Sequence, residues 1–195
     1  MRIVCAPDSF KGSMSALVAA QAMREGVLRA VPTADCVLVP MADGGEGTVA
    51  AFTEALGAQL VTVAASDALG RPVRAQYGYL AGARLAVIEV AAAVGLALLK
   101  RNELDVSRAS SFGAGALVRD ALDRGARRLI IGLGGTATND AGAGLMTALG
   151  ARFIGEDGLV LPLGGAALAR LARVDLSGLD PRLAGLEVQV ACDVE

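Results

Sequence analysis

A glycine-rich run at residues 132–140 is the part of this sequence best suited to binding an anion. The run reads Gly132-Leu133-Gly134-Gly135-Thr136-Ala137-Thr138-Asn139-Asp140 and follows the apolar segment 129–131. Glycines let the backbone approach a ligand closely, and the first N–H groups of a helix carry a partial positive charge. We therefore expect a phosphate or carboxylate here, at a helix that opens near Asn139. The residues expected to surround it are Gly134, Gly135, Thr136, Thr138, Asn139 and Asp140.

Two other interpretations of this run stay open. The glycines can simply form a tight turn into a helix that one of the polar residues 138–140 caps. The run from Gly132 to Ala137 also matches the dinucleotide fingerprint Gly-x-Gly-x-x-Ala, and Glu156 or Asp157 follows about 20 residues later, as that fingerprint requires. A nicotinamide-dependent oxidoreductase of the NAD type is therefore an alternative function. The carboxylate of Asp140 would, however, repel a pyrophosphate unless a cation lay between them. Asp140 therefore indicates magnesium or a substrate with a hydroxyl group.

A second chemical group is the loop Asp8-Ser9-Phe10-Lys11-Gly12-Ser13, which follows the first apolar segment. The Lys11 ammonium can hold a phosphate or carboxylate, and the serine hydroxyls can donate hydrogen bonds. Asp8 stands at the C-terminal end of a predicted strand, where α/β proteins place their active sites. The alternative is that this loop caps a helix and that Lys11 is solvated.

The third group is the loop Asp43-Gly44-Gly45-Glu46-Gly47-Thr48, which also follows a predicted strand. Two carboxylates in a glycine-rich loop can bind Mg²⁺ or accept a proton from a substrate. The alternative is that Asp43 and Glu46 only complement the dipole of the following helix.

The three loops together favour phosphoryl transfer. Loops of this kind converge on one crevice of an α/β sheet, and phosphoryl transfer needs a phosphate cradle, a cation, a metal and a carboxylate. The chain contains no histidine, which excludes histidine-dependent hydrolysis and the His-Glu-x-x-His zinc site within these residues. No Gly-x-x-x-x-Gly-Lys-Ser/Thr motif is present, so the chain is not a P-loop enzyme.

The elements that position these loops follow from the hydrophobic pattern. Apolar runs predict strands at 2–6, 36–39, 128–131, 152–154 and 187–191. Apolar residues at three- and four-residue steps, or a preceding glycine-rich or polar loop, predict helices at 15–30, 48–56, 112–124, 141–149 and 164–171. Ser13 or Ser15 is expected to cap the first of these helices. Alternation between 59 and 90 predicts a β-hairpin near 73–90 around the turn 80–83.

This order of elements predicts an α/β fold of Rossmann-like or flavodoxin-like parallel sheet layers with helices on both faces. We expect two α/β domains or subdomains, one at 1–65 and one at 66–195 that contains the hairpin. The last predicted strand runs into Cys192-Asp193-Val194-Glu195 with no closing helix, which leads us to expect a truncated chain.

Composition narrows the class of protein. The chain has 195 residues, 54% of them hydrophobic, which is enough to bury a core. Its net charge is −2 and its basic residues form no cluster, which argues against a nucleic-acid partner. The longest apolar stretch, 85–99, is shorter than the roughly 20 residues of a membrane span. The N-terminus lacks the pattern of a secretory signal, so we expect a cytoplasmic location and no membrane partner. Cys5, Cys36 and Cys192 lack metal or disulfide spacing and are expected to be small buried residues.

Four segments resemble the bacterial type I glycerate 2-kinase family, in the order of that family and over its N-terminal portion. They are Asp8–Ser13, Met41–Thr48, Gly132–Asp140 and Ala191–Val194, and weaker matches occur at 67–73, 88–91 and 175–180. The resemblance implies a phosphotransferase that uses ATP and Mg²⁺ to phosphorylate D-glycerate to 2-phosphoglycerate. It also implies two α/β domains with the active site in the cleft between them.

The resemblance also suggests roles for particular residues. Lys11, Asp43 and Asp193 are expected to be catalytic, and Asp43, Asp140 and Asp193 to share the metal. The residues expected at the substrate or phosphates are Asp8, Ser9, Gly44, Gly45, Glu46, Gly134, Gly135, Thr136, Thr138, Asn139 and Asp140. Which acid acts as the base, which glycerate hydroxyl reacts and the oligomeric state are not specified by the sequence.

The sequence departs from the family pattern in two places. Val94 replaces the serine of Ala-Ser-Gly-Leu, and Phe112-Gly113-Ala114-Gly115-Ala116 replaces Tyr-Gly-Thr-Gly-Glu. The missing hydroxyl and carboxylate remove two expected substrate contacts. Family members also continue beyond the Ala-Cys-Asp-Val segment, so we expect a ligand-binding fragment without turnover as an alternative to an active enzyme.

Overall fold

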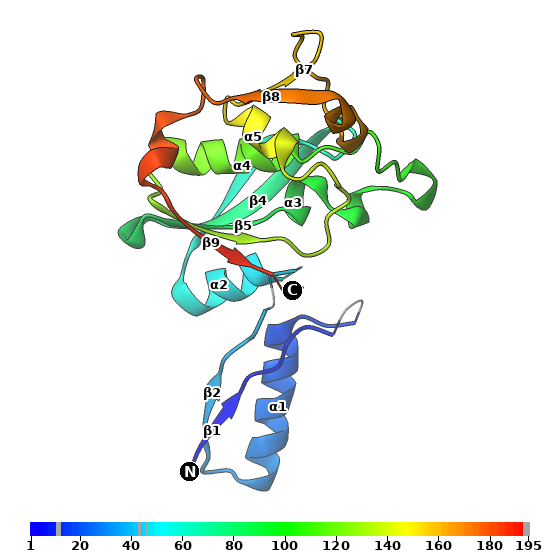
Figure 1. Ribbon diagram of the computed structural model, residues 1–195. Coiled ribbons are helices and arrows are strands. Elements are labelled where there is room, and N and C mark those ends of the chain that lie inside the picture. The colour runs from blue at the N-terminus through cyan, green and yellow to red at the C-terminus, as the bar shows by residue number, and fades with distance from the viewer. Residues whose placement is uncertain (11–12, 43, 46, 193–195) are drawn as a thin grey trace.

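The computed structural model describes residues 1–10, 13–42, 44–45 and 47–192 (Figure 1). The first unit of the fold is a strand–helix–strand motif made of β1 (Arg2–Cys5), α1 (Ala16–Ala30) and β2 (Asp35–Leu38). β1 and β2 are parallel. The Ser15 hydroxyl accepts a hydrogen bond from the Val18 N–H at 3.3 Å, which confirms one of the two predicted N-caps of α1.

A five-stranded sheet forms the centre of the larger part of the chain. Its strands lie in the order β3 (Gln59–Ser66), β4 (Pro72–Leu80), β5 (Leu85–Glu89), β6 (Arg128–Gly132) and β9 (Glu187–Ala191). β4 is antiparallel to both of its neighbours, β3 and β5, whereas β5, β6 and β9 are parallel. The predicted hairpin near 73–90 is therefore confirmed as β4 and β5.

The α/β class is confirmed, and the sheet combines the parallel strands β5, β6 and β9 with antiparallel strands that include the predicted hairpin. The reason is the length of the connections. Residues 67–71 and 81–84 join β3 to β4 and β4 to β5, and such short links can only reverse the chain, whereas a parallel crossover needs a dozen residues or more.

Helices cover both faces of the five-stranded sheet, as the sequence predicted. α2 (Thr48–Leu56) packs on β4 and β5 from one side, and α3 (Ala91–Val94) and α4 (Phe112–Asp123) pack from the other (Figure 1). α5 (Ala143–Ala148) packs on α4. The largest fully buried side chains in this core include Tyr77, Ile88, Leu117 and Leu129.

Two glycines of α4 allow this close packing. A Cβ at Gly113 would overlap the backbone of Ser66 in β3, and a Cβ at Gly115 would lie 2.5 Å from the Cβ of Ala148 in α5. Both glycines come from the segment 112–116, in which the family pattern also has two glycines. They let the helix approach a strand on one side and another helix on the other.

Beyond α5 lies a separate antiparallel pair, β7 (Arg152–Gly155) and β8 (Leu171–Asp175). The short helix expected at 164–171 is present as the 3-10 helix η4 (Gly165–Arg170). The sequence did not predict β8 or the single turn α3. β8 is mostly exposed and lacks an alternating burial pattern, so its hydrophobic pattern gives no strand signal.

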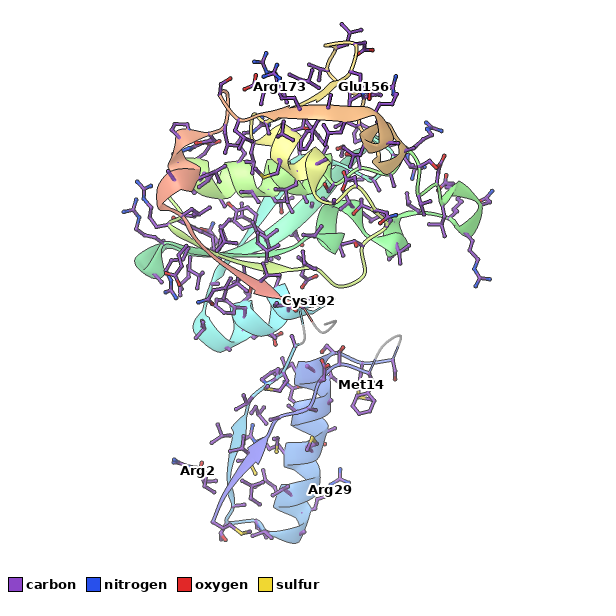
Figure 2. All side chains as sticks on the ribbon, in the orientation of Figure 1. Arg2, Met14, Arg29, Glu156, Arg173 and Cys192 are labelled. Atoms are coloured by element: carbon purple, nitrogen blue, oxygen red, sulfur yellow. The ribbon has the colours of Figure 1, made fainter. Side chains whose placement is uncertain are left out.

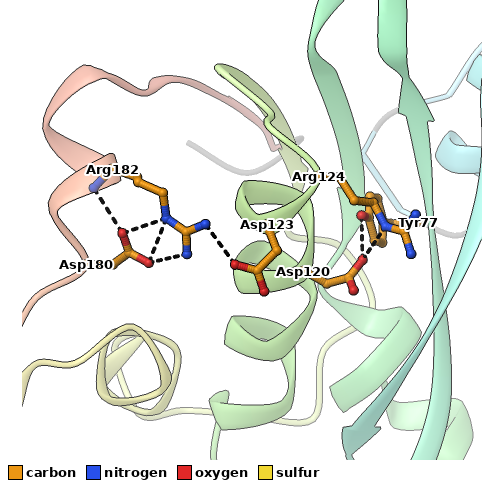
Figure 3. A network of polar contacts seen from close by, with 6 residues as sticks. All are labelled: Tyr77, Asp120, Asp123, Arg124, Asp180 and Arg182. Carbon is orange, nitrogen blue, oxygen red and sulfur yellow. Dashed lines mark hydrogen bonds and ion pairs between the residues drawn. The ribbon is translucent and has the colours of Figure 1, made fainter.

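Two polar clusters fix α4 at its C-terminal half (Figure 3). The hydroxyl of Tyr77 in β4 donates to Asp120 at 2.8 Å, and Arg124 donates to the same carboxylate. On the opposite side, Arg182 of η5 (Pro181–Gly185) donates to Asp123 at 2.8 Å. These contacts tie α4 both to the sheet and to the segment before β9.

The predicted division between residues 1–65 and 66–195 stays a prediction. The structure pairs β3, which ends at Ser66, with β4 along its whole length, so the two segments share one sheet at this position. Among the described residues, no helix is long and apolar enough to cross a bilayer.

Candidate functional site

The parallel strands β5, β6 and β9 end side by side at Glu89, Gly132 and Ala191. The Val90 N–H donates to the Gly132 carbonyl at 3.0 Å, and the Leu133 N–H donates to the Ala191 carbonyl at 3.2 Å. Ligands of open α/β sheets bind outside the carboxyl ends of parallel strands. This edge of the sheet is therefore the candidate functional site.

The loop Gly44-Gly45 lies directly on this edge. The Gly134 N–H donates to the Gly44 carbonyl at 3.3 Å, and a Cβ at Gly134 would lie only 2.8 Å from the Cα of Gly45. A Cβ at Gly132 would overlap the carbonyl of Gly44. Two of the three predicted loops are thus in backbone contact, and the glycines permit it because any side chain would separate them.

The same loop leads directly into α2. The Gly45 carbonyl accepts the Thr48 hydroxyl at 2.9 Å, and Gly47 adopts a left-handed conformation with a φ of 98° before the helix begins at Thr48. The predicted helix at 48–56 is therefore confirmed as α2.

The loop after β1 lies beside the loop after β2. The Met41 N–H donates to the Pro7 carbonyl at 2.9 Å, and Ser9 shares a small hollow of about 40 Å³ with Met41 and Gly47. Asp8 is exposed, and its carboxylate accepts the N–H of Ser9 at 2.6 Å. The first predicted loop therefore contacts the second, which in turn contacts the glycine run.

The second half of the glycine run pairs with the C-terminal end of α3 and the residues that follow it. The Leu96 N–H donates to the Gly135 carbonyl and the Ala137 N–H donates to the Val94 carbonyl, both at 2.9 Å. This pairing does not use the N–H groups of Gly135 and Thr136. Gly135 is exposed and has a φ of 72°, and Thr136 is half-buried. These two residues are therefore among the accessible residues of the run.

Asp140 lies outside this accessible part of the run, because it is only 2% exposed. One carboxylate oxygen accepts the Ser111 N–H at 2.8 Å, the Ser111 hydroxyl at 3.0 Å and the Gly144 N–H at 3.0 Å. The other accepts the Gly142 N–H at 3.2 Å. Asp140 therefore caps the starts of α4 and α5, which is the capping interpretation of this acid.

The helix after the glycine run starts later than expected. α5 begins at Ala143 and not near Asn139, because Ala141 and Gly142 have positive φ values of 50° and 76°. It has only six residues, so an anion near Gly135 would not lie at a helix N-terminus. Thr138 is half-buried and Asn139 is exposed, and their roles in binding stay predictions.

The dinucleotide fingerprint lacks its structural context. Its acid should follow the strand next to the glycine loop in the same sheet. Glu156 instead follows β7, which pairs only with β8 among the described strands. Figure 2 places Glu156 at the opposite end of the larger part of the chain from Cys192. The structure thus gives the nicotinamide interpretation no support.

Glu89 also lies at this edge, although it is not among the predicted site residues. Its carboxylate accepts the Val49 N–H, in the first turn of α2, at 2.7 Å. It also borders a hollow of about 620 Å³ with Thr53, Arg74 and Gln76. The available signal was an acid at the end of the buried apolar segment 85–88, where an ionised group is costly unless it is hydrogen-bonded.

Four predicted residues, Lys11, Asp43, Glu46 and Asp193, lie outside the described residues. In the part of the chain that the structure describes, no group of three or more acidic, cysteine or histidine side chains could hold a metal ion. The Mg²⁺ site therefore stays a prediction from the sequence.

Comparison with known proteins identifies the fold. A sequence model of the glycerate kinase family matches residues 3–195. The chain belongs to the glycerate kinase family. It is 47% identical to a glycerate kinase of Bacillus subtilis (strain 168) over 195 residues, which cover all of this chain and 51% of the relative. It is 45% identical to a glycerate 2-kinase of Escherichia coli (strain K12), again over 51% of that relative.

A crystal structure of a glycerate kinase 2 candidate from Salmonella typhimurium LT2 has the same fold. Its TM-score is 0.90 at 48% identity, and the match covers 100% of this chain and 53% of that one. The chain thus spans about half the length of the relatives that it matches. The predicted family, including its N-terminal portion, is confirmed.

The structure places the two positions at which the sequence departs from the family pattern. Val94 is completely buried in the main hydrophobic cluster, and its carbonyl holds Ala137. Ala116 is half-buried on α4. A serine at position 94 would therefore be buried in the core of this fold, where the valine contributes apolar packing.

Proposed function

We propose that this chain forms part of the active site of an ATP-dependent glycerate kinase, which phosphorylates D-glycerate to 2-phosphoglycerate. The observation that supports this proposal is the backbone contact between Gly44-Gly45 and Gly132–Gly134. It joins two loops of the glycerate kinase pattern at the carboxyl ends of parallel strands.

Each loop would contribute a different function to the reaction. The N–H groups of Gly135 and Thr136 would donate hydrogen bonds to an anionic oxygen, because the backbone pairing with Val94 and Leu96 does not use these two N–H groups. Lys11 would neutralise the glycerate carboxylate or a phosphate. Asp43 and Asp193 would orient the reacting hydroxyl or hold Mg²⁺, which stabilises charge on the transferred phosphoryl group.

Asp140 is less suited to direct metal binding than Asp43 and Asp193 are proposed to be. Its carboxylate accepts four hydrogen bonds from Ser111, Gly142 and Gly144, and it is buried. We propose that it shapes the glycine run by holding the start of α5. The cytoplasmic location and the small-molecule partners, glycerate and ATP, stay predictions from the sequence.

The test is phosphorylation of D-glycerate, assayed in two forms of the protein. One form is the 195-residue chain alone. The other, here called the joined chain, is residues 1–195 fused to the C-terminal half of the Bacillus subtilis relative. We expect ATP-dependent 2-phosphoglycerate from the joined chain, and Lys11→Met or Asp43→Asn should lower kcat about 100-fold or more without unfolding it.

The matched controls are Lys100→Met and Asp105→Asn, which change the same residue types outside the site. They should stay within about twofold of the unsubstituted joined chain. A joined chain that neither phosphorylates nor binds D-glycerate would contradict the proposed function. Unchanged rates in Lys11→Met and Asp43→Asn would show that these loops only cap helices.

A further inference from the structure

The start of α2 is capped from a strand and not from its own loop. The described residues directly before the helix are glycines, so they supply no side chain that could cap its first turn. The Val49 N–H is one of the donors that a helix leaves unpaired at its start. It donates to the carboxylate of Glu89 at 2.7 Å. Glu89 is half-buried at the C-terminal end of β5, 40 residues further along the chain.

The helix start is in turn bound to the Gly44-Gly45 loop. The Thr48 hydroxyl donates to the Gly45 carbonyl at 2.9 Å, and the Gly44 carbonyl accepts the Gly134 N–H at 3.3 Å. The Val49 side chain is buried in a small hydrophobic cluster where α2 packs on β5. The position of this loop over the glycine run therefore depends on where α2 begins.

Glu89 lies at the strand position that best connects the two. It pairs in register with Gly132, and a Cβ at Gly132 would overlap the Gly44 carbonyl. We propose that Glu89 is a positioning residue, whose carboxylate fixes the start of α2 and thereby holds the Gly44-Gly45 loop against the glycine run. The effect of Glu89 on the reaction rests on the proposed function, whereas its effect on the loop does not.

The chemistry of the cap separates this role from a catalytic one. A cap needs an oxygen that accepts a hydrogen bond, and the side chain of glutamine keeps such an oxygen. A general base or a metal ligand needs the ionised carboxylate, which glutamine lacks. Glu89→Gln and Glu89→Leu therefore give different results for the two roles.

The first experiment measures kcat and KM for D-glycerate in the joined chain. Glu89→Leu removes the acceptor, and it should lower kcat about 30-fold while KM changes less than about threefold, because the loop is displaced. Glu89→Gln should keep kcat within about threefold of the unsubstituted joined chain. Glu54→Leu is the matched control at an exposed position of the same helix and should stay within about twofold.

Two outcomes of this experiment would overturn the proposal. Glu89→Gln as slow as Glu89→Leu would show that the charge itself is required and would make Glu89 catalytic. Glu89→Leu as fast as the Glu54→Leu control would show that the cap does not affect the reaction.

The second experiment measures amide hydrogen exchange in residues 1–195 and does not depend on the reaction. Glu89→Leu should speed exchange at Val49 and Gly134 about tenfold or more, since one loses its acceptor and the carbonyl that the other uses moves away. Exchange within β6 should be unchanged, and Glu89→Gln should keep both amides slow. If the joined chain is inactive, the proposed function fails, and this experiment still decides whether Glu89 holds the loop. Unchanged exchange at Val49 and Gly134 in Glu89→Leu, or equally faster exchange throughout β6, would overturn the proposal.

Discussion

Asp140 shows how one buried carboxylate can hold two helix starts and a loop together. Its oxygens accept hydrogen bonds from Ser111 before α4 and from Gly142 and Gly144 around the start of α5. The sequence placed an acid beside a phosphate-binding run and left a metal, a substrate or its own helix as partners. The capping role was predictable from residues 140–144, but the contact with Ser111 was not, since it joins residues 29 positions apart.

Replacement of Asp140 tests this role. Asp140→Ala leaves several buried donors without an acceptor, and we expect it to lower the free energy of unfolding of residues 1–195 by about 3 kcal/mol. Asn139→Ala, at the exposed neighbouring position, should change it by less than about 0.5 kcal/mol. Denaturation with urea measures both. An Asp140→Ala protein as stable as the Asn139→Ala control would contradict the capping role.

The glycines of the site illustrate a limit of sequence reasoning at the residue scale. Their spacing predicted an anion site or a dinucleotide fingerprint. The structure shows that Gly132 and Gly134 are needed because Gly44 and Gly45 press against them. No local pattern gives this contact, which joins residues about 90 positions apart. Anion binding by Gly135 and Thr136 stays a prediction.

At the scale of elements, η5 is held to α4 by a chain of charges (Figure 3). Arg182 donates through its side chain to Asp180 at 2.6 Å and to Asp123 at 2.8 Å. The Arg182 side chain and its backbone N–H stabilise the ionised form of Asp180 and lower its pKa to about 2. The ordinary value is 3.8.

This shift predicts a pH dependence of stability. Because the pKa is lower in the folded chain, the stabilisation is fully present above pH 4 and is lost as the pH falls from 3.8 towards 2. Asp180→Asn keeps a capping side chain but removes the charge. It should cost about 1 kcal/mol at pH 7, since the partly exposed pair is screened by solvent, and progressively less below pH 4.

Urea denaturation at several pH values measures this difference. An Arg182→Gln background is the control, since Asp180→Asn should lose most of its pH dependence there. A difference between Asp180→Asn and the unsubstituted chain that stays constant from pH 7 to pH 3 would contradict this explanation.

Most helices and strands were predictable at this scale because their patterns are local. The periodicity of 15–30, the alternation around 73–90 and the apolar run before Gly132 each match an element closely. α3 and β8 were missed because one is a single turn and the other is an exposed strand without alternation. The short turn at 80–83 predicted the antiparallel direction of β4 and β5, whereas the turn at 67–71, which reverses the chain between β3 and β4, was not used.

At the scale of the whole molecule, the sequence predicted the α/β class, helices on both faces and convergence of the three loops. The structure confirms the class and the helices, and it brings the loop after β2 into contact with the glycine run. The sequence did not predict that β1 and β2 pair apart from the five-stranded sheet and leave Val4, Val37 and Val39 exposed. That feature depends on which segments are present to pair, and this chain spans about half the length of its relatives.

The central claim is that the contact between Gly44-Gly45 and the glycine run builds a glycerate-phosphorylating site. The most direct test is kcat/KM for D-glycerate in the joined chain with Gly134→Ala. The added Cβ would displace the Gly45 backbone, so we expect a loss of about 100-fold with the fold retained. Gly82→Ala is the control, since nothing lies within 4 Å of its added Cβ, and it should stay within about twofold. A Gly134→Ala protein as active as the Gly82→Ala control would contradict the account.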